Sequence, residues 1–125
     1  MDARAAARAW IDGWTQGWQA ADVEPIAALY SDDAVFRSHP FREPETSPRD
    51  YAERALADEA LIECRFGEPV VDGSRAAVEY WALLQTERGE ETLAGIAVIR
   101  FGPDGLVVEH RDYWSMQAGR VPSRF

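Results

Sequence analysis

The stretch Leu106-Val-Val-Glu-His-Arg-Asp-Tyr-Trp-Ser-Met116 decides how the second half of the chain is organised. Read as a strand, it places every second side chain on one face, so that His110, Asp112 and Trp114 project together. A purely structural strand fills its inward positions with Val, Ile or Leu, whereas an imidazole, a carboxylate and an indole in a row are typical of a pocket wall. The pattern therefore predicts a small-molecule site on this strand.

Strand-like runs and glycine-containing turns alternate in the rest of this half, which predicts a four-strand antiparallel meander. The other runs are Leu61–Val71, Arg75–Thr86 and Glu91–Phe101, and the turns are Asp72-Gly73, Arg88-Gly89 and Pro103-Asp104-Gly105. The pattern of the run 75–86 does not decide which of its two faces is inward, because alternation fits two sets of residues. One set is Glu79, Trp81 and Leu83, and the other is Val78, Tyr80, Ala82 and Leu84.

The first half of the chain has helical spacing. Apolar residues recur at three- and four-residue steps at Ala3, Ala6, Ala7, Trp10, Ile11, Trp14 and Trp18. Gly13 and Gly17 inside this helix each cost about 1 kcal/mol relative to Ala, which indicates close packing there. Asp22 is a good N-cap for a second short helix, which we expect to carry Tyr30 on its apolar side.

Shorter elements follow. We expect Ser31-Asp32-Asp33 to end the second helix, Ala34–Ser38 to form a short strand and a proline-rich loop to follow from His39. A third helix is predicted from Pro48 to Glu59. The order helix, helix, strand, helix, meander predicts a single α+β domain over residues 1–125. In it, a cone-shaped, curved antiparallel or mixed sheet packs on three N-terminal helices and encloses a pocket.

Composition excludes several classes of protein. The 125 residues are 46% hydrophobic and carry a net charge of −9, which suits a globular domain and argues against binding to nucleic acid or anionic membranes. The absence of a long apolar run or a signal-peptide pattern leads us to expect a cytoplasmic protein. With Cys64 as the only cysteine there is no intrachain disulfide, and the lack of lysine excludes Schiff-base catalysis. All thirteen basic residues are arginine, as is typical of a GC-rich bacterial genome.

The chain resembles the nuclear transport factor 2-like superfamily, which includes the SnoaL-like and ketosteroid isomerase-like proteins. The resemblance rests on the stretch from Asp22 to Phe36 (DVEPIAALYSDDAVF), on the turn Ile99–Gly105 and on Asp112-Tyr-Trp-Ser115. It implies the cone fold and a homodimer formed through the outer sheet face, where Ile96, Val98 and Arg100 are candidates. Because this fold hosts both enzymes and binding proteins, the resemblance leaves the activity open.

The resemblance also bears on the reaction. Ketosteroid isomerases pair a first-helix tyrosine with a protonated aspartate, and the matching positions here are Trp14 and Ala97. Since Ala97 cannot donate a hydrogen bond, we expect no steroid isomerisation by that mechanism. SnoaL-like cyclases place an aspartate and a histidine in the pocket from late strands, as Asp112 and His110 would be here. The loop that supplies the isomerase base offers His39 instead.

Candidate site residues follow from these patterns. Asp112 is the candidate general base, since a carboxylate in an apolar cavity is desolvated and accepts a proton more readily, and His110 and His39 are the other catalytic candidates. The alternative for Asp112 is an ion pair with an arginine or a place at the rim. The candidate ligand-binding residues are Trp14, Trp18, Tyr30, Tyr51, Glu79, Trp81 and Trp114. No HxH, HExxH or cysteine pair is present, so we expect neither a metal nor another cofactor.

Two main classes of function remain. The first is a cofactor-independent acid–base enzyme that acts on a small, mostly apolar carbonyl compound by isomerisation, cyclisation, dehydration or a lyase step. The second is a non-catalytic protein that binds a small molecule in the same aromatic pocket. A third possibility is that the cone is filled by its own side chains and the protein acts through its outer sheet face.

Overall fold

The computed structural model describes all 125 residues, which form three helices and six strands. Its elements are α1 (Ala3–Ala20), α2 (Glu24–Ala27), β1 (Tyr30–Arg37), α3 (Pro48–Asp58), β2 (Ala60–Phe66), β3 (Val70–Asp72), β4 (Arg75–Thr86), β5 (Gly89–Phe101) and β6 (Val107–Ala118). The six strands form one curved sheet in the order β1-β6-β5-β4-β2, with β3 paired to β4. Only the β1–β6 pairing is parallel.

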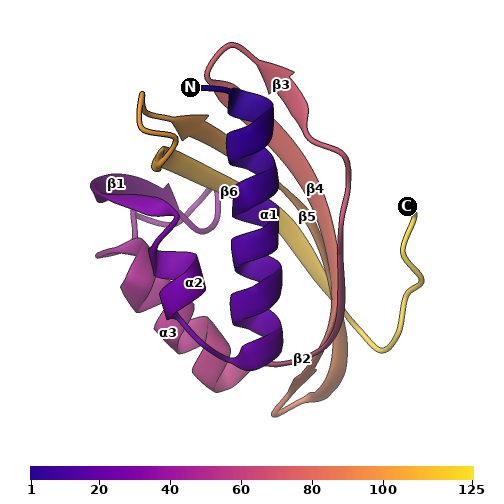
Figure 1. The fold of residues 1–125 in the computed structure, drawn as a ribbon. Coiled ribbons are helices and arrows are strands. Elements are labelled where there is room, and N and C mark those ends of the chain that lie inside the picture. Colours follow the sequence, from indigo (N-terminus) through magenta and orange to yellow (C-terminus); the bar gives the residue numbers. More distant parts are fainter.

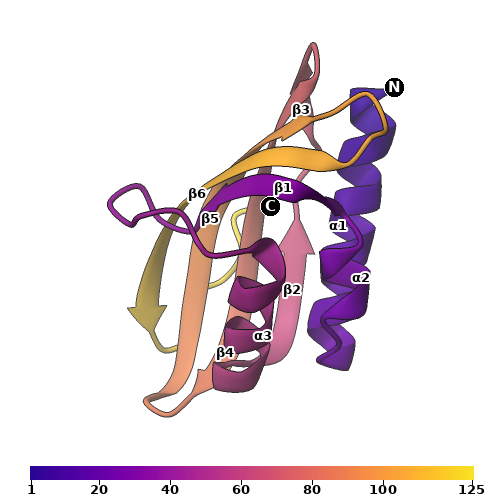
Figure 2. The same ribbon diagram turned by 90° about the vertical axis from the view of Figure 1, so that its left-hand side faces the viewer.

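The helices lie on one side of this sheet, with α1 crossing it lengthwise and α2 and α3 beside it (Figure 1). A view from the side shows that the strands bend around the helical layer (Figure 2). This mixed, curved sheet on three helices confirms the predicted fold class. None of the helices combines the length and the apolar character that crossing a membrane would require.

Helix α1 begins at the side chain of Asp2, which accepts hydrogen bonds from the backbone N–H groups of Arg4 and Ala5. Its glycines allow the close packing that the sequence predicts. A Cβ atom on Gly13 would lie 2.7 Å from Leu29 Cδ1, and one on Gly17 would lie 2.7 Å from the backbone oxygen of Asp22. Because glycine lacks this atom at both positions, α1 can lie this close to the segment around α2.

The second helix is shorter than predicted, and Tyr30 starts β1 instead of ending α2. Sheet pairing explains the difference. Tyr30 pairs with Val107 of β6, and the Val107 N–H donates to the Leu29 carbonyl, so backbone groups that a longer helix would use are engaged by the sheet. The expectation that Asp32 and Asp33 end a helix is therefore wrong, since both lie within β1.

The predicted run 61–71 is interrupted, because Gly67, Glu68 and Pro69 separate β2 from β3. Proline has no N–H to donate to a neighbouring strand, so it breaks a continuous ladder. The chain still follows β4 here, and the Gly67 N–H donates to the Glu79 carbonyl. The third helix begins as predicted, with the Ser47 hydroxyl accepting a hydrogen bond from the Asp50 N–H.

Strand β4 takes the second of the two registers that the sequence left open. Its inward side chains Val78, Tyr80, Ala82 and Leu84 are all buried. Glu79 points to the opposite, outer face and is exposed. Trp81 lies on that outer face too, where its indole N–H donates to the Val121 carbonyl at 2.8 Å. The C-terminal segment thus covers Trp81, which explains how an outward residue is buried.

Candidate functional site

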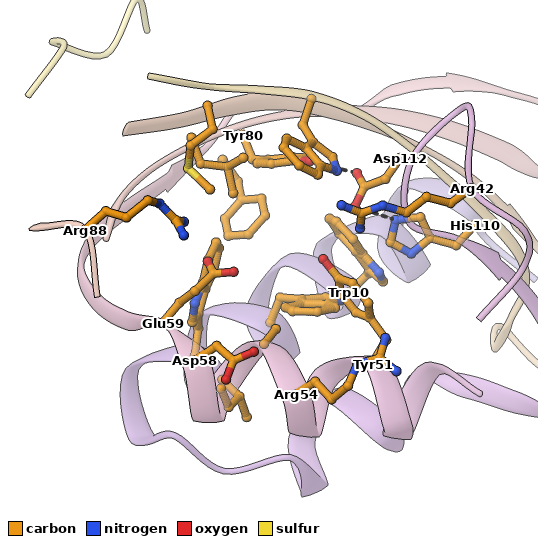
Figure 3. Close-up of a pocket in the computed structure, with 18 residues that line it drawn as sticks. Trp10, Arg42, Tyr51, Arg54, Asp58, Glu59, Tyr80, Arg88, His110 and Asp112 are labelled. Carbon is orange, nitrogen blue, oxygen red and sulfur yellow. Dashed lines mark hydrogen bonds and ion pairs between the residues drawn. The ribbon is translucent and has the colours of Figure 1, made fainter. Parts of the chain in front are cut away.

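A pocket of about 310 Å³ lies between the helices and the concave face of the sheet (Figure 3). Aromatic and aliphatic side chains make up most of its wall. They come from α1, α3 and strands β2, β4, β5 and β6, and they are Trp10, Trp14, Trp18, Tyr51, Ala55, Leu56, Phe66, Tyr80, Leu93, Trp114 and Met116. The volume suits a small organic molecule.

Asp112 supplies the carboxylate at one end of the pocket. It is 9% exposed, and its Oδ1 accepts a hydrogen bond of 2.8 Å from the Tyr80 hydroxyl. Burial, followed by the charge of Asp112, raises the pKa of Tyr80 well above its usual range, so Tyr80 stays a donor. Asp112 has no arginine partner within ion-pair distance. The second carboxylate oxygen therefore remains free of any hydrogen bond from the protein.

His110 lies two residues before Asp112 on the same face and is 2% exposed. Its Nδ1 is 2.9 Å from the Tyr30 hydroxyl. That hydroxyl also accepts two indole N–H bonds, from Trp10 at 3.0 Å and from Trp14 at 2.9 Å. Burial, above all, raises the pKa of Tyr30 far beyond its usual range. These four side chains form a hydrogen-bonded cluster, which we call the Tyr30 cluster, and three of them, Trp10, Trp14 and His110, also line the pocket.

The other imidazole nitrogen, Nε2, is buried and has no hydrogen-bond partner in the protein. It lies 3.7 Å from Asp112 Oδ2, which is beyond the distance of a good N–H···O bond. His110 and Asp112 both line the pocket, so the unpaired nitrogen and the carboxylate oxygen belong to side chains of its wall. Buried polar atoms without a partner are rare in native proteins, so this nitrogen calls for a partner from outside the protein, a ligand or a water.

Trp114 continues the same strand face and contributes only its ring. Its indole N–H is already engaged, because it donates to the Ser38 carbonyl at 2.6 Å. The Arg42 guanidinium lies 5.3 Å from the centre of the Trp114 ring, a cation–π contact. His39 packs edge-on against Trp114 at 5.1 Å between ring centres, and it is not among the residues that line the pocket.

Charged residues surround the opposite end of the pocket. Figure 3 shows Asp58, Glu59 and Arg88 there, away from His110 and Asp112. Burial raises the pKa of the Glu59 carboxyl, the negative charges of Asp58 and Glu91 add to this effect, and the positive charge of Arg88 opposes it. The pocket thus has Asp58, Glu59 and Arg88 at one end and the buried carboxylate of Asp112 at the other, and Arg42 and Arg54 also line it.

The structure brings most of the sequence-predicted site residues to this pocket. The residues that line it are Trp14, Trp18, Tyr51, His110, Asp112 and Trp114. Tyr30 lies directly behind His110 as part of the Tyr30 cluster. His39, Glu79 and Trp81 lie elsewhere: His39 lies behind Trp114, and the other two are on the outer sheet face. The indole N–H of Trp14 donates to the Tyr30 hydroxyl, so it is not free to bind a ligand.

Sequence reasoning did not single out Tyr80 or Gly95. Tyr80 belonged to the alternative register of β4 and was assigned to a core. Gly95 lies beside Tyr80 in β5, where a Cβ atom would be 2.7 Å from the Tyr80 hydroxyl oxygen and 2.8 Å from Trp114 Cβ. A glycine in the middle of a strand signals such a close approach. Arg42 and Glu59 were missed because loops and helix ends carry no periodic signal.

Comparison with known proteins identifies the family. Residues 7–110 match the SnoaL-like domain, so the chain belongs to the SnoaL-like family and the superfamily resemblance of its sequence is confirmed. A search of curated protein sequences gives no match.

Solved structures share the fold at low sequence identity. An LEH-like epoxide hydrolase from M. tuberculosis is 20% identical with a TM-score of 0.69, and the match covers 88% of this chain and 82% of that one. The epoxide hydrolase/cyclase-like enzyme SalBIII, which has a role in pyran ring formation in the polyether salinomycin, is 15% identical with a TM-score of 0.78. The match covers 91% of this chain and 93% of that one. A hypothetical protein with a ketosteroid isomerase-like fold from Catenulispora acidiphila, in complex with trimethylamine, is 13% identical with a TM-score of 0.71, and the match covers 84% of each chain.

Proposed function

We propose that the protein is a cofactor-independent acid–base enzyme that acts on a small, mostly apolar carbonyl compound. The observation that carries this proposal is the Oδ2 atom of Asp112, which lines an aromatic pocket and has no arginine within ion-pair distance. A carboxylate held this way by one hydrogen bond from Tyr80 is positioned to take a proton from a ligand. The surrounding tryptophans favour a flat, apolar body for that ligand.

The proposed chemistry begins with a proton on a carbon next to a carbonyl group. Asp112 takes the proton, and the electron pair of the broken C–H bond moves into the carbonyl to give an enolate. Where the enolate is conjugated with a C=C bond, return of the proton at the far carbon would be an isomerisation. Attack of the enolate on a second carbonyl of the same molecule, with transfer of the proton from Asp112 to the new alkoxide, would be a cyclisation. The cyclase-like name of one structural neighbour fits this class. Steroid isomerisation with a carboxylic-acid donor is not part of the proposal, because Ala97 faces Asp112 across β5 and β6.

Hydrogen–deuterium exchange tests this proposal without knowledge of the natural substrate. Small aryl ketones are incubated with the protein in D₂O, and loss of their α-proton signal is followed by NMR. We expect wild-type protein to accelerate the exchange and Asp112→Asn to lose roughly 10²- to 10⁴-fold of that acceleration. The control is Asp12→Asn, because Asp12 is exposed on α1 and is not among the residues that line the pocket.

Two results would contradict the proposal. Equal exchange by the wild type and Asp112→Asn would exclude Asp112 as the base. Binding of the ketones without exchange by any variant would instead identify the protein as a non-catalytic binding module. The homodimer implied by the superfamily is a separate proposal, and light scattering coupled to gel filtration tests it.

A further inference from the structure

The partners of the Tyr30 hydroxyl determine which nitrogen of His110 carries the proton. An indole N–H can only donate, so the two bonds from Trp10 and Trp14 occupy both acceptor positions of the Tyr30 oxygen. The single hydroxyl proton of Tyr30 then has one acceptor within reach, the Nδ1 of His110 at 2.9 Å. Nδ1 must therefore carry no proton.

A neutral imidazole whose Nδ1 accepts a hydrogen bond carries its proton on Nε2. The alternative protonation states conflict with the cluster. A proton on Nδ1 would leave three donors facing one Tyr30 oxygen, and the Tyr30 proton would have no acceptor in a site where Tyr30 and His110 are both buried. The Nε2–H is then a buried donor on the pocket wall, 3.7 Å from Asp112 Oδ2, and no protein atom accepts it within hydrogen-bond distance.

We infer that His110 is a neutral hydrogen-bond donor for an oxygen atom of the ligand, and that Tyr30, Trp10 and Trp14 are positioning residues that fix its tautomer. As far as it concerns the ligand, this inference rests on the proposed function. It assigns opposite roles to the adjacent groups. Asp112 is the acceptor of a proton, and His110 holds the oxygen on which negative charge develops.

The spacing of the two groups fits such a ligand. His110 Nε2 and Asp112 Oδ2 are 3.7 Å apart. In a carbonyl compound the oxygen and the neighbouring carbon are about 2.4 Å apart, from bond lengths of about 1.23 and 1.52 Å. An oxygen at about 2.9 Å from Nε2 therefore leaves the adjacent carbon facing Oδ2 at contact distance. The same spacing is too long for His110 and Asp112 to satisfy each other.

Nitrogen NMR of the histidine rings tests the tautomer directly. The chain has only two histidines, so ¹⁵N-labelled wild type and His39→Gln together assign both rings. We expect His110 to show a protonated Nε2 and an unprotonated Nδ1 near neutral pH. In Tyr30→Phe the Nδ1 loses its donor, and we expect a mixture of the two tautomers. A proton on Nδ1 in the wild type, or a doubly protonated ring, would overturn the inference.

A pair of probes of nearly the same shape tests the ligand's oxygen. Acetophenone presents a carbonyl oxygen, whereas α-methylstyrene has a methylene group in its place. We expect acetophenone to shift the His110 Nε2–H resonance and α-methylstyrene to leave it in place. The absence of a carbonyl-specific shift up to the solubility limit would overturn the role of His110 as the ligand's donor. Both readouts are independent of whether Asp112 acts as a base, so they separate this inference from the proposed function.

Discussion

Replacing Tyr30 with phenylalanine removes one oxygen atom and three hydrogen bonds. The variant leaves the indole N–H groups of Trp10 and Trp14 and the Nδ1 of His110 without partners, in a region where Tyr30 itself is only 7% exposed. Each buried polar group that loses its partner costs about 1–3 kcal/mol. Three such groups give an expected loss of roughly 3 kcal/mol in the free energy of unfolding, taking the lower bound for each.

Urea unfolding followed by far-ultraviolet circular dichroism measures this loss. With a slope of about 1.5 kcal/mol per molar urea, the midpoint should fall by about 2 M. Tyr51→Phe is the matched control, because the Tyr51 hydroxyl forms no hydrogen bond within the protein although its ring packs on Phe36 in the same core. We expect this control to change stability by less than about 0.5 kcal/mol. Equal midpoints for the two variants would refute the idea that Tyr30 links three buried groups.

Three further changes have defined outcomes. Gly95→Ala places a Cβ atom 2.7 Å from the Tyr80 hydroxyl oxygen and 2.6 Å from a backbone oxygen. The substitution should therefore lower both the urea midpoint and the rate of ketone exchange. An unchanged exchange rate would contradict the close approach of Gly95 to the Tyr80 hydroxyl. Burial raises the pKa of Glu59 in the folded protein above its value in the unfolded chain. Protonated Glu59 therefore contributes to stability below the unfolded-state pKa, and this contribution is lost as the pH rises through the folded-state pKa. Glu59→Gln should therefore gain in melting temperature over wild type from about pH 4 to about pH 7, whereas exposed Glu53→Gln should show no such trend. Ser47→Ala removes the N-cap bond to Asp50 and should cost about 1 kcal/mol in urea unfolding, and no measurable cost would contradict the capping role.

The strongest periodic signals predicted the elements that build the pocket. The apolar spacing of the first helix and the alternation around His110 and Asp112 both depend on one face being buried and the other not. The same reasoning did not decide which face of strand β4 is inward, and the cause is physical. Five consecutive residues from Tyr80 to Leu84 are buried, since the C-terminal segment covers Trp81 on the outer face. Alternation carries no information where both faces of a strand are covered.

The position of Tyr30 could not be read from its neighbours. Its place in β1 depends on parallel pairing with β6, and its hydroxyl meets a histidine eighty residues later in the chain. The charged rim was equally hidden, because the end of α3 and the turn between β4 and β5 meet only in the folded protein. Such long-range contacts are set by topology and not by local sequence pattern.

The distribution of tryptophan gives the protein a built-in optical reporter. Four of its five indoles, Trp10, Trp14, Trp18 and Trp114, line the pocket, and Trp81 is held on the far side of the sheet. Filling the cavity changes the surroundings of the first group and leaves the fifth indole undisturbed. Intrinsic fluorescence can therefore rank candidate metabolites by affinity without a label, and Trp81→Phe would remove the constant background from that signal.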